Sequence, residues 1–149
     1  MVNWLSEYVK YKSVTGEELE VQEKFVFPAV RTLDPNHVEL YAVDKERKRP
    51  NLVATFKGAG KGRSLLFNGH TDVAPMSEEQ LKRWRVDPWK ATREGELVYG
   101  HGVADMKGGI AAMIWAIIHL WISFGVLVGV IVRRVAWLML LSCFVLRGF

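Results

Sequence analysis

Cysteine is nearly missing from this sequence, and no secretory leader is visible. Cys143 is the single cysteine, so no disulfide can form within the chain, which is typical of a reducing compartment. The first ten residues include Glu7 and lack the long apolar core of a signal peptide. These two absences predict a cytoplasmic protein.

Acidic residues are also absent from the C-terminal part of the chain, where no Asp, Glu or Lys follows Lys107. The formal net charge is +4, but Arg133, Arg134 and Arg147 supply three of these charges. The rest of the chain is therefore almost balanced, which argues against a nucleic-acid partner. With 149 residues, half of them hydrophobic, the chain is long enough for about one folded domain.

The first third of the sequence has two helical patterns. Apolar residues recur at helical spacing over residues 3–11 and predict a short amphipathic helix. Residues 15–18 (TGEE) then match a capping box, with Thr15 as the N-cap of a helix that continues through Val26. Pro28 is expected to bend or end this helix.

Strand formers dominate the next segments. Residues 37–43 and 51–57 flank a charged turn and predict a β-hairpin. Leu65-Leu66-Phe67 is expected to be a strand buried on both faces, and residues 97–99 a brief strand. A helix follows from Lys107 to about Leu120. The predicted fold class is α/β, with a mixed sheet sandwiched by helices.

Two glycine-bounded loops carry the candidate site residues. His70 and Asp72 directly follow the predicted strand, and Asp105 lies in the second loop. Imidazole and carboxylate groups suit zinc, and one aspartate can bridge two ions. His70 and Asp72 are two residues apart, so both point to one side of an extended chain. The alternative is a hydrogen-bonded loop for His-x-Asp and a helix cap for Asp105.

Three segments together resemble one family. They are residues 66–75 (LFNGHTDVAP), 84–89 (WRVDPW) and 99–109 (YGHGVADMKGG). They are similar to the family of acetylornithine deacetylase and succinyl-diaminopimelate desuccinylase, which comprises zinc aminoacylases and exopeptidases. The resemblance covers about residues 1–117.

The resemblance implies a role for each candidate residue. His70 would bind one zinc ion, Asp105 would bridge two, and the catalytic residue Asp72 would steer His70. The implied reaction is hydrolysis of the amide bond of an N-acyl amino acid or a small peptide, with cobalt or manganese as alternative metals.

The general base and the later metal ligands of this family lie beyond its bridging aspartate. Because no acidic residue follows Asp105 here, the resemblance implies an incomplete and inactive fragment. The lid domain that often mediates dimerisation in the family is missing too. Neither the acyl group of the substrate nor the oligomeric state follows from the sequence.

The C-terminal tail, residues 118–149, does not match the family pattern. Residues 110–132 contain no Asp, Glu, Lys or Arg and would span about 34 Å as a helix, enough to cross a bilayer. Three hypotheses remain: a shifted reading frame after residue 117, a membrane-anchored remnant, and half of a split enzyme. The alternative function is a non-enzymatic, membrane-associated protein whose metal-site motifs are vestigial.

Overall fold

The computed structural model describes residues 1–42, 49–58 and 62–127, with side chains as far as residue 120. The chain divides into two compact units, residues 1–114 and residues 115–149. The first unit holds all the predicted site residues. The second begins within the last helix, and its described part is helical.

The predicted N-terminal helix is confirmed as α1, Val2–Val9. One face of α1 is buried, and Leu5 and Val9 form a small core with Ala111 of the last helix. Tyr8 is fully buried, and its ring stacks on Phe25 with 5.3 Å between the ring centroids. This core ties α1 to two segments that are distant in sequence.

A continuous helical run follows as α2 (Leu19–Val21), η1 (Gln22–Val26) and α3 (Phe27–Arg31). The predicted capping box is wrong. The helix begins at Leu19 with Glu18 as N-cap, and the Thr15 hydroxyl bonds elsewhere. The π-helical turn η1 ends two residues before Pro28, which has no N–H to continue the usual ladder of hydrogen bonds. The predicted irregularity is therefore present, but it falls one turn early.

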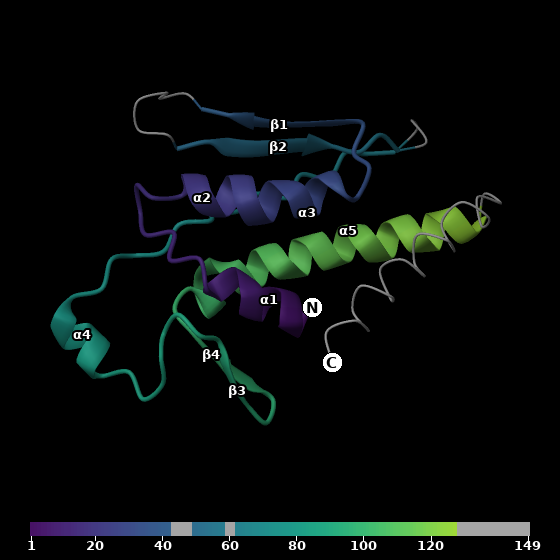
Figure 1. Ribbon diagram of the computed structural model, residues 1–149. Coiled ribbons are helices and arrows are strands. Elements are labelled where there is room, and N and C mark those ends of the chain that lie inside the picture. Colours follow the sequence, from purple (N-terminus) through teal and green to yellow (C-terminus); the bar gives the residue numbers. More distant parts are fainter. Residues whose placement is uncertain (43–48, 59–61, 128–149) are drawn as a thin grey trace. The chain divides into compact units, whose positions relative to one another are not determined.

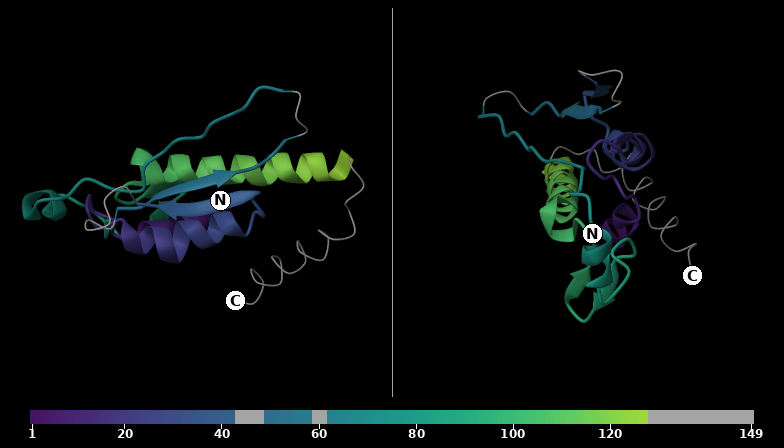
Figure 2. Two further views of the ribbon diagram at one scale, coloured as in Figure 1. Left: turned by 90° about the horizontal axis from the view of Figure 1, so that it is seen from above. Right: turned by 90° about the vertical axis from the view of Figure 1, so that its left-hand side faces the viewer.

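The predicted hairpin is confirmed, with β1 (His37–Tyr41) antiparallel to β2 (Asn51–Thr55). Figures 1 and 2 show the two strands side by side, and β1 contacts α3. Exposed and half-buried residues alternate along both strands, as expected for a sheet with one solvated face. Most of the predicted charged turn lies outside the described residues.

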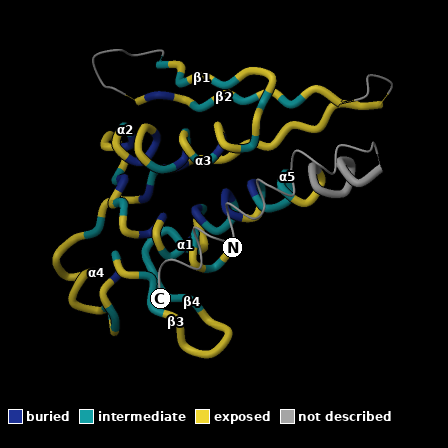
Figure 3. Tube along the Cα trace, turned by 45° about the vertical axis from the view of Figure 1, so that its right-hand side comes forward, coloured by how far each residue is buried: buried dark blue, intermediate teal, exposed yellow. Residues whose placement is uncertain are grey.

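The strand predicted at Leu65-Leu66-Phe67 is wrong. These residues form no strand, and Leu65 and Leu66 are 72% and 86% exposed. Figure 3 shows the long exposed segment to which they belong. An apolar run of this kind becomes a buried strand only where neighbouring strands and helices cover it. Among the described residues no segment pairs with it as a strand.

The long polar segment after the first loop contains one short helix that the sequence analysis missed. This is α4, Glu78–Lys82, and its N-terminus has a complete capping box between Ser77 and Gln80. The next strands, β3 (Thr92–Glu94) and β4 (Leu97–Tyr99), form a second antiparallel hairpin, so the strand predicted at 97–99 is confirmed.

The last described elements are η2 (Val103–Lys107) and α5 (Gly108–Leu127), which confirms the predicted helix and extends it. Gly108 opens α5 at a point where a Cβ atom would lie 2.4 Å from the Val103 carbonyl oxygen. Any other residue would collide with the preceding turn, so the glycine lets α5 begin directly after the second loop.

The described part of the chain belongs to the α/β class. It holds two separate two-stranded antiparallel sheets rather than one mixed sheet. The helix-covered mixed sheet thus stays a prediction. Residues 103–120 are apolar and long enough to cross a membrane, a test that the core helix of a soluble protein also passes.

Candidate metal centre

The first loop is held in place by the segment that follows α1. Val14 and Val73 form an isolated parallel bridge, in which Thr15 N donates to Val73 O (3.1 Å) and Val73 N donates to Ser13 O (2.9 Å). The side chains of the loop alternate, with Thr71 and Val73 buried and His70 exposed. The loop therefore turns its metal-binding groups outward from a fixed backbone.

Thr71 is anchored from the buried side. Its carbonyl oxygen accepts a hydrogen bond from Ser13 Oγ (2.8 Å), and its hydroxyl accepts one from Gln22 Nε2 (3.1 Å). Both donors are buried, and Ser13 has a φ of 31°, a left-handed conformation that is rare for serine. These bonds fix Thr71, the residue between His70 and Asp72, from the buried side of the loop.

The second loop brings Asp105 to His70. Gly102 allows the entry to η2, because it has a φ of 78° and a Cβ atom there would lie 2.4 Å from Val73 Cγ1. Asp105 follows within η2, and the peptide bond between Asp105 and Met106 is cis. Asp105 Oδ1 lies 3.0 Å from His70 Nε2.

The structure therefore brings all three predicted site residues together. His70 Nδ1 lies 3.1 Å from Asp72 Oδ1 and 3.1 Å from Asp72 O, on the opposite side of the ring from Asp105. His70 and Asp72 face one side of the chain, as their spacing predicts. The roles assigned to the three residues remain predictions.

The electrostatics of the site favour a protonated histidine between two carboxylates. Partial burial by itself would lower the pKa of His70, but bonds to the Asp72 backbone oxygen and the Asp105 carboxylate outweigh it and raise the pKa. Burial opposes ionisation of Asp72, yet the Thr15 hydroxyl and His70 lower its pKa overall. The cluster thus favours a positive charge at the place where a cation would bind.

The donor atoms fit one edge of a zinc site. Two ligand atoms that each lie about 2.1 Å from a tetrahedral zinc ion are about 3.4 Å apart. His70 Nε2 and Asp105 Oδ1 are 3.0 Å apart, so a small opening would admit an ion between them. The carboxylate of Asp72 on Nδ1 is the usual orienting partner of a zinc-bound imidazole.

The described residues do not complete such a site. Among them no group of three His, Cys, Asp or Glu side chains could hold a metal ion. Asp72 is occupied with the far nitrogen of His70, which leaves His70 and Asp105 as the pair of candidate ligands.

Aromatic residues line a hollow of about 460 Å³ formed by residues that follow the first loop and precede Asp105. His101 lies at its wall, with Nε2 2.7 Å from the carbonyl oxygen of Ala74 and its ring edge-on to both Trp84 and Trp89. Trp84 is among the residues that line the hollow, whereas Trp89 contacts His101 without being one of them.

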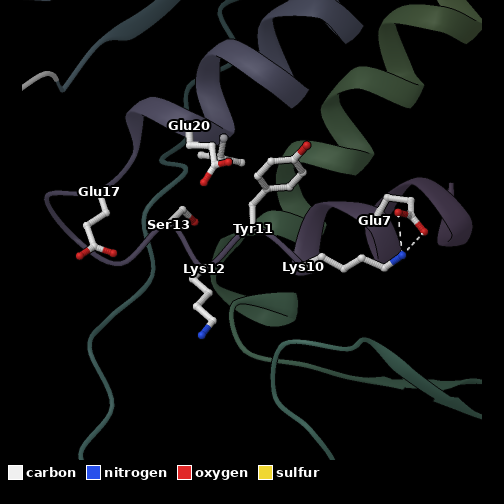
Figure 4. Close-up of a pocket in the computed structure, with 8 residues that line it drawn as sticks. Glu7, Lys10, Tyr11, Lys12, Ser13, Glu17 and Glu20 are labelled. Carbon is white, nitrogen blue, oxygen red and sulfur yellow. Dashed lines mark hydrogen bonds and ion pairs between the residues drawn. The ribbon is translucent and has the colours of Figure 1, made fainter.

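A second hollow, of about 530 Å³, lies at the end of α1. Figure 4 shows Lys10 paired with Glu7 and Lys12 pointing away from Glu20. Both acidic and basic side chains line it, and none of the three site residues does. It selects no class of ligand by charge.

Sequence reasoning missed the residues that hold the two loops. Thr15 was interpreted as a helix cap, and Ser13, Gln22 and Lys107 were given no role. A serine or glutamine carries no sequence signal for burial, so these contacts could not be anticipated. Lys107 lies inside the second motif, but nothing in the motif shows that its ammonium is buried.

Comparison with known proteins places the two loops in one family. Residues 66–132 match the model of peptidase family M20/M25/M40, a range that includes His70, Asp72 and Asp105 and runs past the predicted boundary at residue 117. The site residues therefore lie in the part of the chain that the family model covers.

Individual proteins are also similar in sequence to this chain. The chain is 46% identical over 77 residues to a succinyl-diaminopimelate desuccinylase of Novosphingobium aromaticivorans, covering 52% of this chain and 20% of the relative. It is 30% identical over 121 residues to the enzyme of that name from Helicobacter hepaticus, covering 78% of this chain and 30% of the relative. A third relative is an N-formyl-4-amino-5-aminomethyl-2-methylpyrimidine deformylase of Halalkalibacterium halodurans, 46% identical over 69 residues, which are 45% of this chain and 16% of the relative.

These relatives have the coarse function in common, since each is named for removing an acyl group. They support a metal-dependent amidohydrolase family for this chain. In each of these comparisons, however, the match spans less than a third of the relative's length.

Proposed function

Because this chain contains the N-terminal part of a catalytic domain of peptidase family M20/M25/M40, we propose that it supplies the first half of the metal site of an amide hydrolase. The substrate class is an N-acyl amino acid or a small peptide, and the metal is zinc, with cobalt or manganese as alternatives. His70 and Asp105 are the ligands, and Asp72 orients His70. The observation that carries the proposal is the 3.0 Å approach of His70 Nε2 to Asp105 Oδ1, with Asp72 on the other ring nitrogen.

Each residue has a distinct task in this proposal. Asp72 accepts the Nδ1 proton of His70, which leaves the Nε2 lone pair free for the ion. Asp105 is far more exposed than Asp72, so its second oxygen is open to another ion. The bound metal would polarise the substrate carbonyl and lower the pKa of a water molecule.

The chain by itself is expected to be a poor catalyst. Two protein ligands hold zinc weakly, and no Asp or Glu follows Asp105 in the sequence to act as general base. Little or no hydrolysis and weak metal binding are therefore the expected properties of the chain taken alone.

Zinc titration of the purified chain by calorimetry tests this proposal. The wild type should bind zinc with a Kd in the micromolar range or weaker, and H70A should weaken binding at least about tenfold. His37 is an exposed histidine on β1, so H37A is the matched control and should leave the affinity unchanged. Tight binding of two ions together with hydrolysis of N-acetylornithine would contradict the inactive half-site. Equal zinc binding by wild type and H70A would contradict the ligand assignment.

A non-enzymatic membrane protein is the second candidate, because residues 103–120 are long and apolar enough to cross a bilayer. Three residues of this stretch, Ile110, Ala111 and Ile114, are instead buried in the first unit. A helix that buries them against protein cannot present them to lipid. The hydrolase half-site is therefore preferred. Extraction of the chain from cells only by detergent would favour the membrane candidate.

The tail after residue 117 has its own test. The family match runs on to residue 132, so the comparison does not set the boundary at 117. We propose that a shifted reading frame produces the tail. The other two frames of the encoding DNA beyond codon 117 should then contain an acid-rich continuation with a Glu-Glu pair. If neither frame contains one, the tail belongs to the protein as it stands.

A further inference from the structure

Thr15 contacts the candidate metal centre from a segment 57 residues away in sequence. Its hydroxyl donates a 2.7 Å hydrogen bond to Asp72 Oδ2. The other carboxylate oxygen, Oδ1, lies 3.1 Å from His70 Nδ1. Thr15, Asp72 and His70 thus form a chain of contacts that ends at the nitrogen facing Asp105.

The position of Thr15 is set by its backbone and not by burial of its side chain. Its N–H donates to the carbonyl oxygen of Val73, and Val73 N donates in turn to Ser13 O. These two bonds form the bridge that fixes Thr15 beside the first loop. The Thr15 side chain itself is exposed, so its removal leaves no cavity in the core.

The hydroxyl of Thr15 does not cap the following helix, although its sequence pattern predicts that it does. The helix begins at Leu19, and Glu18 is the residue that accepts the Gly16 N–H, at 2.9 Å. The second acceptor within reach of Thr15 Oγ1 is Val73 O, at 3.4 Å. A hydroxyl has one proton, and the shorter bond to a charged carboxylate is the stronger of the two.

We propose that Thr15 is a positioning residue of the metal centre, which holds the Asp72 carboxylate so that its Oδ1 faces His70. A carboxylate rotates over a broad range about its last torsion angle. The Thr15 hydroxyl fixes Oδ2 and thereby fixes Oδ1. His70 then keeps its proton on Nδ1 and presents Nε2 to the metal. This inference rests on the proposed function for its consequence in metal binding.

Substitution of the hydroxyl separates this role from a structural one. T15V removes the hydroxyl and keeps the shape of the side chain, whereas T15S keeps the hydroxyl. T15V should bind zinc about tenfold more weakly than the wild type, and T15S should bind within about threefold of it. Thr32 donates its hydroxyl to Ala29 O on the surface of α3, so T32V is the matched control and should bind as the wild type does. Thermal unfolding should show all three variants folded.

Two outcomes of the titration would overturn the proposal. Zinc affinity of T15V equal to that of the wild type would show that the hydroxyl does not position Asp72. Equal losses in T15V and T15S would show that the methyl group or the backbone matters and the hydroxyl does not.

A second measurement needs no metal. Nitrogen-15 NMR at about pH 8.5 reports which ring nitrogen of a neutral histidine carries the proton. His70 should be mainly the Nδ1–H tautomer in the wild type and in T15S, and a mixture of tautomers in T15V. An unchanged tautomer in T15V would overturn the role of Thr15. A chain that shows the tautomer change but binds no zinc would contradict the proposed function and leave the positioning role intact.

Discussion

The ammonium group of Lys107 donates a hydrogen bond to the main-chain oxygen of Tyr11, just beyond the end of α1. A second bond, of 3.3 Å, reaches Tyr8 O, and Lys107 is completely buried. The last carbonyls of a helix lack partners within the helix and carry a partial negative charge, which offsets part of the cost of burying the ammonium group. Lys107 lies two residues after Asp105, so this contact ties the second loop to α1.

The variant K107M should be markedly less stable than the wild type. Methionine retains most of the apolar stem but leaves the main-chain oxygens of buried Tyr8 and half-buried Tyr11 without that donor, which costs about 1–3 kcal/mol. The free energy of unfolding in urea measures this cost. Lys82, on the exposed α4, provides the control: K82M should change the stability by less than about 0.5 kcal/mol. Similar values for the two variants would show that the buried bonds contribute nothing.

The same lysine predicts a dependence of stability on pH. Burial lowers the pKa of Lys107 to about 8. Between that value and the ordinary lysine pKa, the unfolded chain holds a proton that the folded chain has released. Stability therefore rises with pH in this range, by about 1–2 kcal/mol between pH 8 and 10. Urea unfolding across this range should show the rise in the wild type and not in K107M. Burial and the charge of Asp72 raise the pKa of Tyr8. Ionisation of Tyr8 in the unfolded chain therefore lowers the stability, but mainly above about pH 10, the ordinary pKa of tyrosine.

Gly102 should resist substitution more than Gly95, although both have a positive φ. A Cβ atom at Gly102 would lie 2.4 Å from Val73 Cγ1, whereas a Cβ atom at Gly95 meets nothing within 4 Å. G95A should cost only the backbone strain, about 1 kcal/mol, and G102A should cost about 2–4 kcal/mol because Val73 must also move. Urea unfolding compares them. Equal losses of stability in the two variants would mean that the Val73 side chain moves aside at no cost in free energy.

Local patterns in the sequence predicted the elements that need no distant partner. The β1–β2 hairpin pairs two neighbouring segments, and α1 and α5 follow from apolar periodicity. The contact between His70 and Asp72 follows from their spacing of two residues. These predictions succeeded because the atoms involved are close in sequence.

Long-range contacts account for the failures. The capping-box pattern at Thr15 is a local preference, and it loses to a carboxylate 57 residues away that the sequence cannot place. Leu65-Leu66-Phe67 has the composition of a buried strand, but burial depends on what packs against it, and in the described structure these residues are exposed. The partners of Lys107 lie 96 and 99 residues away, so its burial had no local signal.

Zinc binding at His70 should weaken as the pH falls. The ion needs the Nε2 lone pair, and the metal-free cluster favours a proton there because the Asp72 backbone oxygen and the Asp105 carboxylate raise the pKa of His70 despite its partial burial. A histidine of raised pKa stabilises the folded chain below the ordinary histidine pKa, and this stabilisation is lost as the pH rises through the folded value.

The variant D105N should lower the pKa of His70 in an NMR titration, because it removes one of the carboxylates that raise it. Glu23 is an exposed carboxylate on η1, so E23Q is the control and should leave that pKa in place. A His70 pKa that D105N leaves unchanged would contradict the 3.0 Å contact.

Leu66 offers a direct test of the exposed segment before the metal-binding loop. Its side chain is 86% exposed in a run of three apolar residues, so L66D removes an apolar contact surface without burying a charge. The free energy of unfolding should change by less than about 0.5 kcal/mol, and light scattering should show less self-association than in the wild type. Val73 is 2% exposed, and V73D should instead destabilise the chain by several kcal/mol, roughly the cost of an unpaired buried charge. If L66D destabilises the chain as V73D does, residues 65–67 are covered in solution, as their composition predicts for a central strand.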